Sequence, residues 1–339
     1  MSHHIDLSNK RIIISRTDSI GDVMLTLPLC TWIKENFSNV HLIFLGNNYT
    51  KPVIDCFSSI DQFADWKETE NFVDKDKVAF LKSLNADAIV HVFPNKEIAK
   101  FSKKAKIGVR VGTSHRIFHF LTCTEKVNFT RKKSPLHESQ LNFELLRPFG
   151  LKAIPSLEEI NEYTKLFYST NEVLPEFIQK KLDSSDKRVI LHAKSQGSAV
   201  EWGLENYRLL ALKLEKKGYM VFFTGTENEG KLIRDQIHFS SSIIDTTGKL
   251  TLAQLIHLIS KSESLVACST GPFHLAGFLS IHAVGLFSPR KPIHPGRWKA
   301  LGSDVHIVVN DEQCPTCQKG KLCKCIELIP VDRVLNELI

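Results

Sequence analysis

The sequence has no long hydrophobic run. Its apolar stretches, such as residues 189–191 and 221–223, are far shorter than the ~20 residues that a membrane-spanning helix requires. The N-terminus also lacks the basic start and following apolar stretch that mark a secretion signal. These absences predict a cytoplasmic protein, which can still touch a membrane face.

The composition excludes several other classes of protein. Of the 339 residues, 42% are hydrophobic and 24% are charged, which excludes intrinsic disorder, collagen-like repeats and a small disulfide-stapled scaffold. The length suits about two domains. An excess of 44 basic over 37 acidic residues gives a net charge of +7, which favours anionic partners such as phosphates, nucleic acid or acidic lipid. Basic residues concentrate at 100–116 and 126–133, either as a solvated surface or as contacts for such a partner.

Strand-like and helix-like segments alternate along the chain. A β-rich run at 11–15 is followed by a helical pattern at 20–36 and a second β-rich run at 40–45, which is a βαβ unit and predicts a parallel sheet. The alternation weakens between 147 and 186 and restarts at 188. We therefore predict two α/β domains, at residues 1–180 and 187–327. Ligands of such domains usually bind in a cleft at the carboxyl ends of the strands.

The loop after the first strand carries a Gly21-Asp22 pair in place of the dinucleotide fingerprint G-x-G-x-x-G. Near a helix N-terminus the Asp22 carboxylate is stabilised in its ionised form, so it can accept a proton from a hydroxyl nucleophile. The alternative is that Asp18, Ser19 and Asp22 only cap the helix.

Residues 225–232 nearly match the phosphate-binding loop G-x-x-x-x-G-K-S/T. Leu232 supplies no hydroxyl for magnesium, and Glu227 and Glu229 would repel a phosphate, so we reject that interpretation. A carboxylate at the end of such a strand can bind a ribose diol, which makes Glu227 a candidate. Alternatively, Glu227 only starts a helix.

A strand-to-helix turn at 268–275 offers free backbone N–H groups and a helix dipole, which together favour a diphosphate. A plain capped helix is the alternative, and His274 is either a contact or a packed core residue. The loop at 192–199 contains Lys194 among small polar residues, a composition that suits a phosphate contact.

Eight cysteines are present. Four are scattered, and we expect them to be reduced and mostly buried: Cys30, Cys56, Cys123 and Cys268. The others form a Cys-x2-Cys-x5-Cys-x-Cys pattern: Cys314, Cys317, Cys323 and Cys325. Such spacing can bind a structural zinc ion tetrahedrally, but the five-residue spacer is short for a zinc ribbon. A redox-sensitive cluster and simple structural thiols are the alternatives.

Several of these segments, in this order, resemble glycosyltransferase family 9, the ADP-heptose:lipopolysaccharide heptosyltransferase family. Ser19-Ile20-Gly21-Asp22 is similar to the family's S-I/M-G-D-V opening. Residues 269–276 are similar to its D/S-T/S-G-P-x-H-L-A motif, and Trp202 with residues 205–207 resembles its W-P-x-E-x-F/Y helix start. The middle of the chain is similar to one branch of the family, at Arg131, His137, Glu138 and Asn142.

The resemblance implies a GT-B fold, with two facing Rossmann-like domains, parallel sheets and a terminal helix (328–339) that packs back on the first domain. It implies an inverting transfer that needs no metal or other cofactor, with Asp22 as the general base. The implied donor-binding residues are Lys194, Ser195, Glu227, Ser269, Thr270, Gly271, Pro272 and His274. The implied acceptor-binding residues are Arg16, Ser19, Gly21, Arg116 and Arg131.

The implied reaction moves a sugar, a heptose from ADP-heptose, to a lipopolysaccharide core or related surface glycan. The partners are then a nucleotide-sugar donor, an anionic lipid-linked acceptor and the cytoplasmic face of the inner membrane, with no nucleic acid.

The sequence departs from the family at Ser269, where many members have Asp, and at Val200 and Glu201, where a basic residue is common. A GT-B nucleotide-sugar epimerase is the alternative enzyme. A basic nucleic-acid-binding protein is the non-enzyme alternative, although no recognition motif is present.

Overall fold

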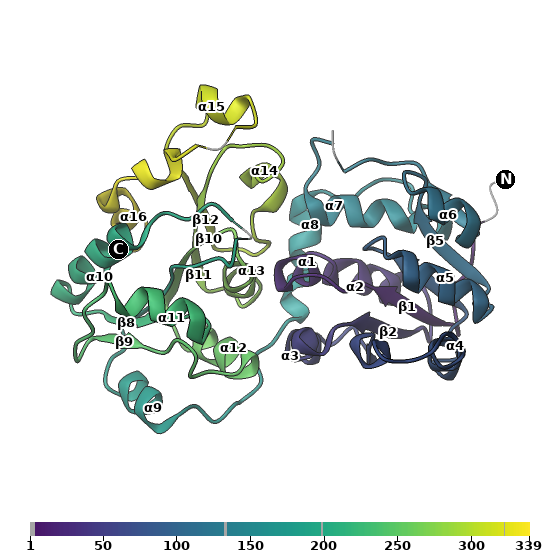
Figure 1. Cartoon of the computed structure of the whole chain (residues 1–339), viewed down its shortest axis with the longest axis horizontal. Coiled ribbons are helices and arrows are strands. Elements are labelled where there is room, and N and C mark those ends of the chain that lie inside the picture. The colour runs from purple at the N-terminus through teal and green to yellow at the C-terminus, as the bar shows by residue number, and fades with distance from the viewer. Residues whose placement is uncertain (1–3, 132–133, 198, 322) are drawn as a thin grey trace. The chain divides into compact units, whose positions relative to one another are not determined.

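A computed structural model describes residues 4–131, 134–197, 199–321 and 323–339. The chain divides into two compact units, Met1–Phe167 and Tyr168–Ile339, each built on a parallel six-stranded sheet with helices on its faces (Figure 1). The boundary falls earlier than the predicted interval of 180–187. The helix at Glu176–Asp183 therefore belongs to the second unit.

In the first unit, strands are ordered β3-β2-β1-β4-β5-β6. The strands are β1 (Arg11–Ser15), β2 (His41–Gly46), β3 (Gln62–Asp65), β4 (Ala88–His91), β5 (Val109–Thr113) and β6 (Glu125–Val127). The α-helices are α1 (Ile20–Met24), α2 (Leu27–Asn36), α3 (Lys51–Asp55), α4 (Asp74–Ser83), α5 (Lys96–Lys104), α6 (Ile117–Thr122), α7 (Glu138–Phe143) and α8 (Leu157–Glu162). Short 3-10 helices are η1 (Asn48–Thr50), η2 (Lys67–Thr69), η3 (Glu144–Phe149) and η4 (Tyr163–Leu166). Ile12, Ile13 and Ile14 of β1 are fully buried because helices cover both faces of this central strand.

The second unit repeats this plan with the strand order β12-β11-β10-β7-β8-β9. The strands are β7 (Arg188–His192), β8 (Met220–Phe223), β9 (Ile243–Asp245), β10 (Ser264–Cys268), β11 (His282–Phe287) and β12 (Val305–Val309). The helices are α9 (Glu176–Asp183), α10 (Leu204–Lys216), α11 (Glu227–Arg234), α12 (Leu252–Ser260), α13 (Gly271–Phe278), α14 (Pro295–Trp298), α15 (Pro315–Gln318), η5 (Cys325–Leu328) and α16 (Val331–Glu337).

The segment predicted as one helix at 20–36 is two helices, α1 and α2. Pro28 lies in the first turn of α2 and has no N–H to continue the hydrogen bonds of α1. The hydroxyl of Thr26 donates to the Asp22 carbonyl at 2.8 Å and satisfies an acceptor where α1 ends. The break leaves α1 as a single short turn at the carboxyl end of β1.

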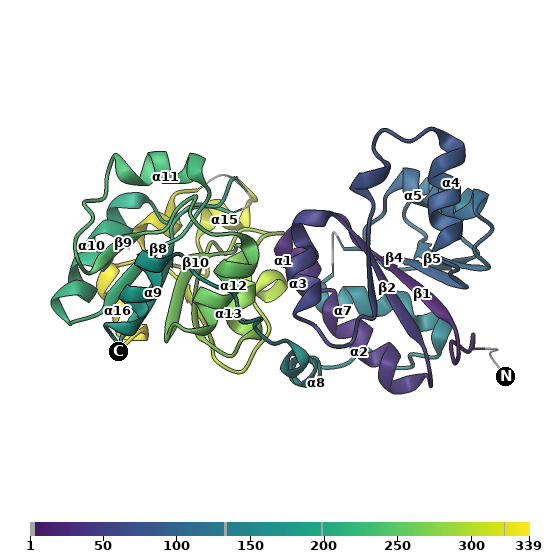
Figure 2. The ribbon, with the colours of Figure 1, turned by 90° about the horizontal axis from the view of Figure 1, so that it is seen from below.

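The terminal helix α16 packs against α10 within the second unit (Figure 2), which corrects the expectation that residues 328–339 lie on the first domain. Val334 and Leu335 are buried in the same apolar core as Leu210 and Leu214. The Lys213 ammonium pairs with Asp332 at 2.7 Å. Burial of its apolar face on α10 accounts for this placement.

Strand order reverses between β1 and β4 in the first sheet and between β7 and β10 in the second. In open parallel sheets, ligands bind beyond the carboxyl ends of the strands at such a reversal. The loops after β1, β7 and β10, together with the helices α1 and α13, carry most of the candidate site residues. Among the described residues, no helix has the length and apolar character needed to cross a membrane.

Candidate active site

In the first unit, the buried guanidinium of Arg16 organises the carboxyl end of β1. Its side chain is 3% exposed and contacts three carboxylates. Its Nε donates to Asp18 Oδ1 at 2.7 Å, and its Nη2 donates to Asp22 Oδ1. Its Nη1 lies 3.7 Å from Glu138 Oε1. A buried guanidinium requires this kind of compensation for its lost hydration.

Asp22 is held from two sides and is still reachable from solvent. Besides the bond from Arg16, the Ser19 hydroxyl donates to Asp22 Oδ2 at 2.5 Å. The side chain of Asp22 is 19% exposed. Ser19 occupies the N-cap of α1 but makes no side-chain capping bond, so its hydroxyl orients Asp22 and does not close the helix end. An aligned carboxylate of this kind can receive a proton from a hydroxyl group.

Charge and burial perturb three groups around Asp22. Burial lowers the pKa of Arg16, but Asp18, Asp22 and Glu138 outweigh it and raise that pKa, so the guanidinium stays charged. Burial raises the pKa of Asp18, and the neighbouring Asp22 raises it further. The Tyr49 hydroxyl donates to the Asp18 carbonyl, and burial together with the charges of Asp18 and Asp22 raises the pKa of Tyr49 to about 12.

A second layer of side chains supports Arg16. Arg131 Nη1 donates to Glu138 Oε1 at 2.5 Å, and its Nη2 donates to the Val92 carbonyl just after β4 at 3.1 Å. Both terminal nitrogens of Arg131 also contact Asn142 Oδ1, at 3.2 and 3.1 Å. Asn142 Nδ2 donates in turn to the Leu25 carbonyl at 2.9 Å. Arg131 thus connects the end of β4 to α7 through its hydrogen bonds. Its predicted contact with the acceptor stays a prediction.

The other predicted acceptor residues have different placements. Gly21 is buried in α1, where its carbonyl accepts from the Leu25 amide at 3.0 Å. Arg116 is exposed at the N-cap of α6, after β5, and is not part of the Arg16 network. Sequence reasoning noted Glu138 and Asn142 only as a family resemblance. It gave them no place beside the base, because their distance of more than 110 positions along the chain carried no contact signal.

In the second unit, Lys194 and Ser195 follow β7 and fold around one carboxylate. The Lys194 ammonium pairs with Glu201 Oε2. The amide and hydroxyl of Ser195 each donate to Glu201 Oε1 at 3.0 Å. Glu201 therefore holds the cation and two hydrogen-bond donors of this loop. Sequence reasoning missed this role, although Glu201 already stood out as an acidic residue where the family often has a basic one.

The start of α13, after β10, lies beside this loop because β10 and β7 are paired strands. Thr270 is the N-cap and Pro272 lies in the first turn, as predicted. The Thr270 side chain makes no capping bond, and its buried Oγ1 has no hydrogen-bond partner among the described residues. A buried hydroxyl of this kind is available to a ligand atom at the helix N-terminus. Ser269 is half-buried and His274 is buried against Phe273, with ring centroids 5.8 Å apart.

Glu227 begins α11 after β8, the strand on the other side of β7. Its side chain is 58% exposed and pairs with Arg234. The adjacent Glu229 closes a capping box with Thr226, accepting from the Thr226 amide at 2.7 Å. This box occupies the helix N-terminus, in agreement with the rejection of a phosphate loop.

His192, which sequence reasoning left unassigned, contacts the Thr224 hydroxyl at 2.9 Å, and burial lowers its pKa despite the nearby Glu229 and Glu201.

Comparison with known proteins identifies the family and the fold of the chain. Residues 87–326 match the family described as Glycosyltransferase family 9 (heptosyltransferase). The chain is 20% identical to lipooligosaccharide heptosyltransferase 2 of Campylobacter jejuni, covering 97% of this chain and 98% of that protein. A glycosyl transferase family 9 structure from Veillonella parvula has a TM-score of 0.77 at 19% identity, covering 99% of this chain and 98% of the other. The ADP-heptose lps heptosyltransferase II of E. coli has a TM-score of 0.75 at 16% identity, covering 97% of each chain.

The similarity to these structures spans both units and confirms the predicted GT-B fold class. The family match spans most of the chain, including β4, the loop after β7, and α13. The chain therefore belongs to glycosyltransferase family 9, the heptosyltransferases, and is a glycosyl-transfer enzyme.

Proposed function

We propose that this enzyme transfers a heptose from ADP-heptose to a lipopolysaccharide core or related surface glycan, with inversion and without a catalytic metal. The observation that carries the proposal is the Asp22 carboxylate, fixed by Arg16 and Ser19 and still reachable from solvent. The name of the E. coli relative, an ADP-heptose lps heptosyltransferase, supports the choice of donor and acceptor class.

In the proposed mechanism, Asp22 removes the proton from the acceptor hydroxyl as that oxygen attacks the anomeric carbon. Attack comes from the face opposite the nucleotide, so the configuration inverts. Arg16 and Ser19 hold the Asp22 carboxylate in one orientation, so the side chain needs little rearrangement before the proton transfer. The anomeric carbon gains positive charge as the nucleotide departs. The acceptor oxygen is the nucleophile of this single step, so the mechanism does not require one from the protein.

The departing diphosphate gains negative charge during the same step. We assign its stabilisation to the backbone N–H groups of Thr270 and Gly271, the unpartnered Thr270 hydroxyl and the Lys194 ammonium. Lys194 reaches a phosphate only by exchanging its bond to Glu201. Glu227 is assigned to the ribose of the nucleotide, and its exposed position leaves it accessible.

The acceptor is proposed to be an anionic, lipid-linked glycan, reached by peripheral contact with a membrane surface. Support comes from the net charge of +7 and from the exposed Arg116 within the basic segment 100–116. Ile117, Phe120 and Leu121 of α6 follow directly and are 86, 59 and 71% exposed. Exposed apolar side chains beside basic ones suit an anionic lipid surface.

The decisive test replaces Asp22 with Asn, which keeps the shape of the side chain and removes its basicity. We expect the rate of transfer to fall by about 10²–10⁴-fold, while the affinity for ADP measured by calorimetry is unchanged. Asp18→Asn is the matched control, because Asp18 also contacts Arg16, and we expect it to lose less than about tenfold. Normal turnover by Asp22→Asn would overturn the assignment of the base.

The family match favours transfer over epimerisation and over nucleic-acid binding. An epimerase would convert ADP-heptose without an acceptor, whereas a transferase requires one. Analysis of products with and without a truncated lipopolysaccharide acceptor separates the two activities. Acceptor-independent conversion of the donor would refute the proposed transfer.

A further inference from the structure

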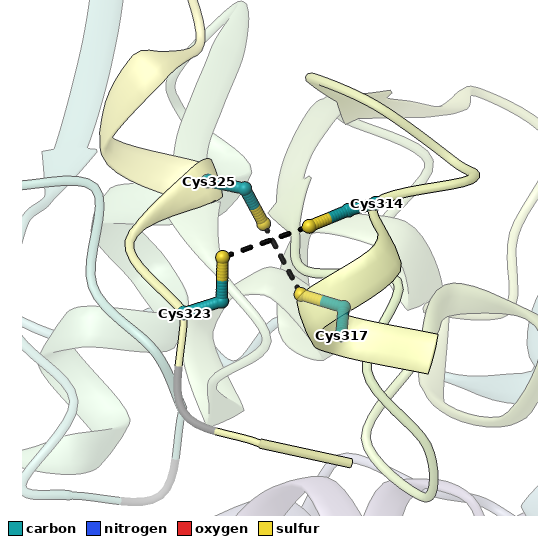
Figure 3. Close-up of side chains that lie close together, drawn as sticks. All are labelled: Cys314, Cys317, Cys323 and Cys325. Atoms are coloured by element: carbon teal, nitrogen blue, oxygen red, sulfur yellow. Dashed lines mark hydrogen bonds between the residues drawn. The ribbon is translucent and has the colours of Figure 1, made fainter. Parts of the chain in front are cut away.

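The four C-terminal cysteines come together in the second unit (Figure 3). The sulfurs of Cys314 and Cys323 lie 3.6 Å apart, and those of Cys317 and Cys325 lie 3.3 Å apart. All four sulfurs lie within 4.8 Å of one another. These separations are much longer than the ~2.05 Å of a disulfide bond. The pairs are therefore non-bonded thiols that converge on a common centre.

The separations suit a tetrahedral thiolate site. Four sulfurs at about 2.3 Å from a central zinc ion lie about 3.8 Å from one another. Cys314 and Cys317 come from one turn at α15, and Cys323 and Cys325 approach from the segment that leads into η5. The sequence alone left a redox cluster and simple structural thiols open, and it could not show that the two halves meet.

The packing of this segment gives a second, independent reason. Cys314, Cys317 and Cys325 are buried and form an apolar cluster whose further member is Cys323. Among the described residues, this cluster has no aliphatic or aromatic member. Four small thiols bury too little apolar surface to order a loop, whereas a metal cross-link supplies that stability directly.

Polar groups around the cluster match what thiolates require. The Ser288 hydroxyl lies 3.4 Å from Cys317 Sγ and 4.0 Å from Cys325 Sγ. The Ser288 hydroxyl can donate a hydrogen bond to these sulfurs. Such hydrogen bonds orient the ligands of a metal and stabilise their negative charge. Three lysines lie within the same stretch and offset the charge of a four-thiolate site: Lys319, Lys321 and Lys324.

We propose that Cys314, Cys317, Cys323 and Cys325 bind one Zn²⁺ ion that ties the C-terminal segment to the sheet of the second unit. Ser288 contacts the cysteine cluster and directly follows β11. Strand β11 pairs with β10, which leads into α13. Protein sulfurs fill all four ligand positions, so the site is structural and leaves no position for substrate. The inference does not depend on the proposed reaction.

A second group of possible ligands, His282, Asp304 and His306, needs no ion to explain it. Asp304 Oδ1 contacts a nitrogen of each histidine at 2.9 Å. The other nitrogen of His282 contacts the Glu337 carbonyl at 2.7 Å. These bonds already join β11 and β12 to α16, and this group provides a control for the metal analysis.

The test measures metal in the full-length chain, purified under reducing conditions with zinc present in the growth medium. We expect about one zinc per chain by elemental analysis, released when a mercurial reagent blocks the thiols. Cys317→Ser should lose most of the zinc. Cys123→Ser, at a buried cysteine outside the cluster, and His306→Ala should both keep it.

Because Cys317→Ser can also fail to fold, the wild-type chain provides an independent measurement. Growth with cobalt should give the visible absorption bands of a tetrahedral cobalt–thiolate centre, and Zn²⁺ should displace them. Iron in place of zinc in zinc-replete cells would overturn the assignment of the ion. Chains without metal, or zinc retained by Cys317→Ser and lost by His306→Ala, would overturn the site.

Discussion

At the scale of single residues, the site depends on charges that satisfy one another. Arg16 is almost fully buried, and so is Glu138, at 2% exposure. A carboxylate removed from water needs a cationic partner, and among the described residues Glu138 pairs with Arg16 and Arg131. The position of the accessible Asp22 depends on this buried arrangement.

Arg16→Gln should therefore destabilise the first unit. Loss of the guanidinium leaves Glu138 and two further carboxylates undercompensated, and we expect the free energy of unfolding to fall by about 3–5 kcal/mol. Urea denaturation at neutral pH measures the change. Arg208→Gln is the control, because its pair with Glu205 is exposed and should contribute little to stability. Equal, small effects of both substitutions would contradict the role of Arg16.

The pair of Lys194 and Glu201 leads to a prediction about donor binding. If the diphosphate replaces Glu201 at Lys194, Glu201→Gln should tighten ADP binding several-fold, because the lysine no longer needs to exchange a carboxylate. Lys194→Gln should weaken binding by about tenfold, through loss of a charge-assisted hydrogen bond. Calorimetric titration with ADP separates the two. Weaker binding in both variants would show that Glu201 positions the loop and does not compete with the ligand.

At the scale of elements, the sequence predicts the central strands and the turns that follow them. The runs at β1, β7 and β10 are apolar on both faces, so they are recognisable without tertiary information. The edge strands β3, β6 and β12 were missed because they are short or partly exposed and carry a weaker pattern. The break between α1 and α2 was overlooked because the apolar spacing continues through Pro28.

The same limit applies to the candidate site. Asp22, Lys194 and the residues around Thr270 lie in loops or helix starts that directly follow central strands, so local sequence identifies them. Glu138 and Glu201 act through contacts with other segments, and only the folded chain shows those contacts.

The turn after β9 permits a matched test of Glu227. Gly248 has φ +71°, and a Cβ there would lie 2.5 Å from Glu227 Oε2 and 3.0 Å from Glu227 Cα. Gly248→Ala should thus displace Glu227 in addition to straining the backbone, which costs about 1 kcal/mol. We expect a lower melting temperature and a raised KM for the donor.

Gly218→Ala is the control for this turn. Gly218 has φ +82°, and no atom of the described residues lies within 4 Å of an added Cβ. It should lose stability by backbone strain alone and keep the KM of the wild type. A similar KM for both variants would remove Glu227 from the donor site.

At the scale of the whole molecule, the first unit contains the proposed base and the second contains the proposed donor site. Asp22 lies in α1, just after β1. Lys194, Glu227 and Thr270 lie just after β7, β8 and β10. Asp22 substitutions should therefore alter catalysis without altering nucleotide affinity.

Buried histidines occur in both units, and they couple the stability of the whole chain to pH.

Stability should fall in mildly acidic solution. Burial lowers the pKa of His91 to about 3, against 6.5 in the unfolded chain. The unfolded state then binds a proton that the folded state does not, so stability is complete above pH 6.5 and declines as pH falls towards 3. One such histidine costs about 1.4 kcal/mol at pH 5.5. Burial lowers the pKa values of His119 and His192 as well, which adds to the loss.

Urea denaturation between pH 7.5 and 5 measures this slope. His91→Asn should reduce the slope, because it removes a histidine whose pKa is lowered by burial to about 3. An unchanged slope in His91→Asn would mean that His91 is not the group responsible.

The network around Arg16 also restricts how an acceptor can approach. Among the described residues of this network, two guanidinium groups, Arg16 and Arg131, pair with three carboxylates, Asp18, Asp22 and Glu138, so these five groups carry one excess negative charge. Glu138 is buried, so a molecule that approaches from solvent meets the negative charge at Asp22 and Asp18. A phosphate of an anionic glycan is repelled there, whereas a neutral sugar hydroxyl is attracted as a hydrogen-bond donor. In the proposed reaction, this charge balance would orient an acceptor with its hydroxyl towards Asp22 and its phosphates away from it.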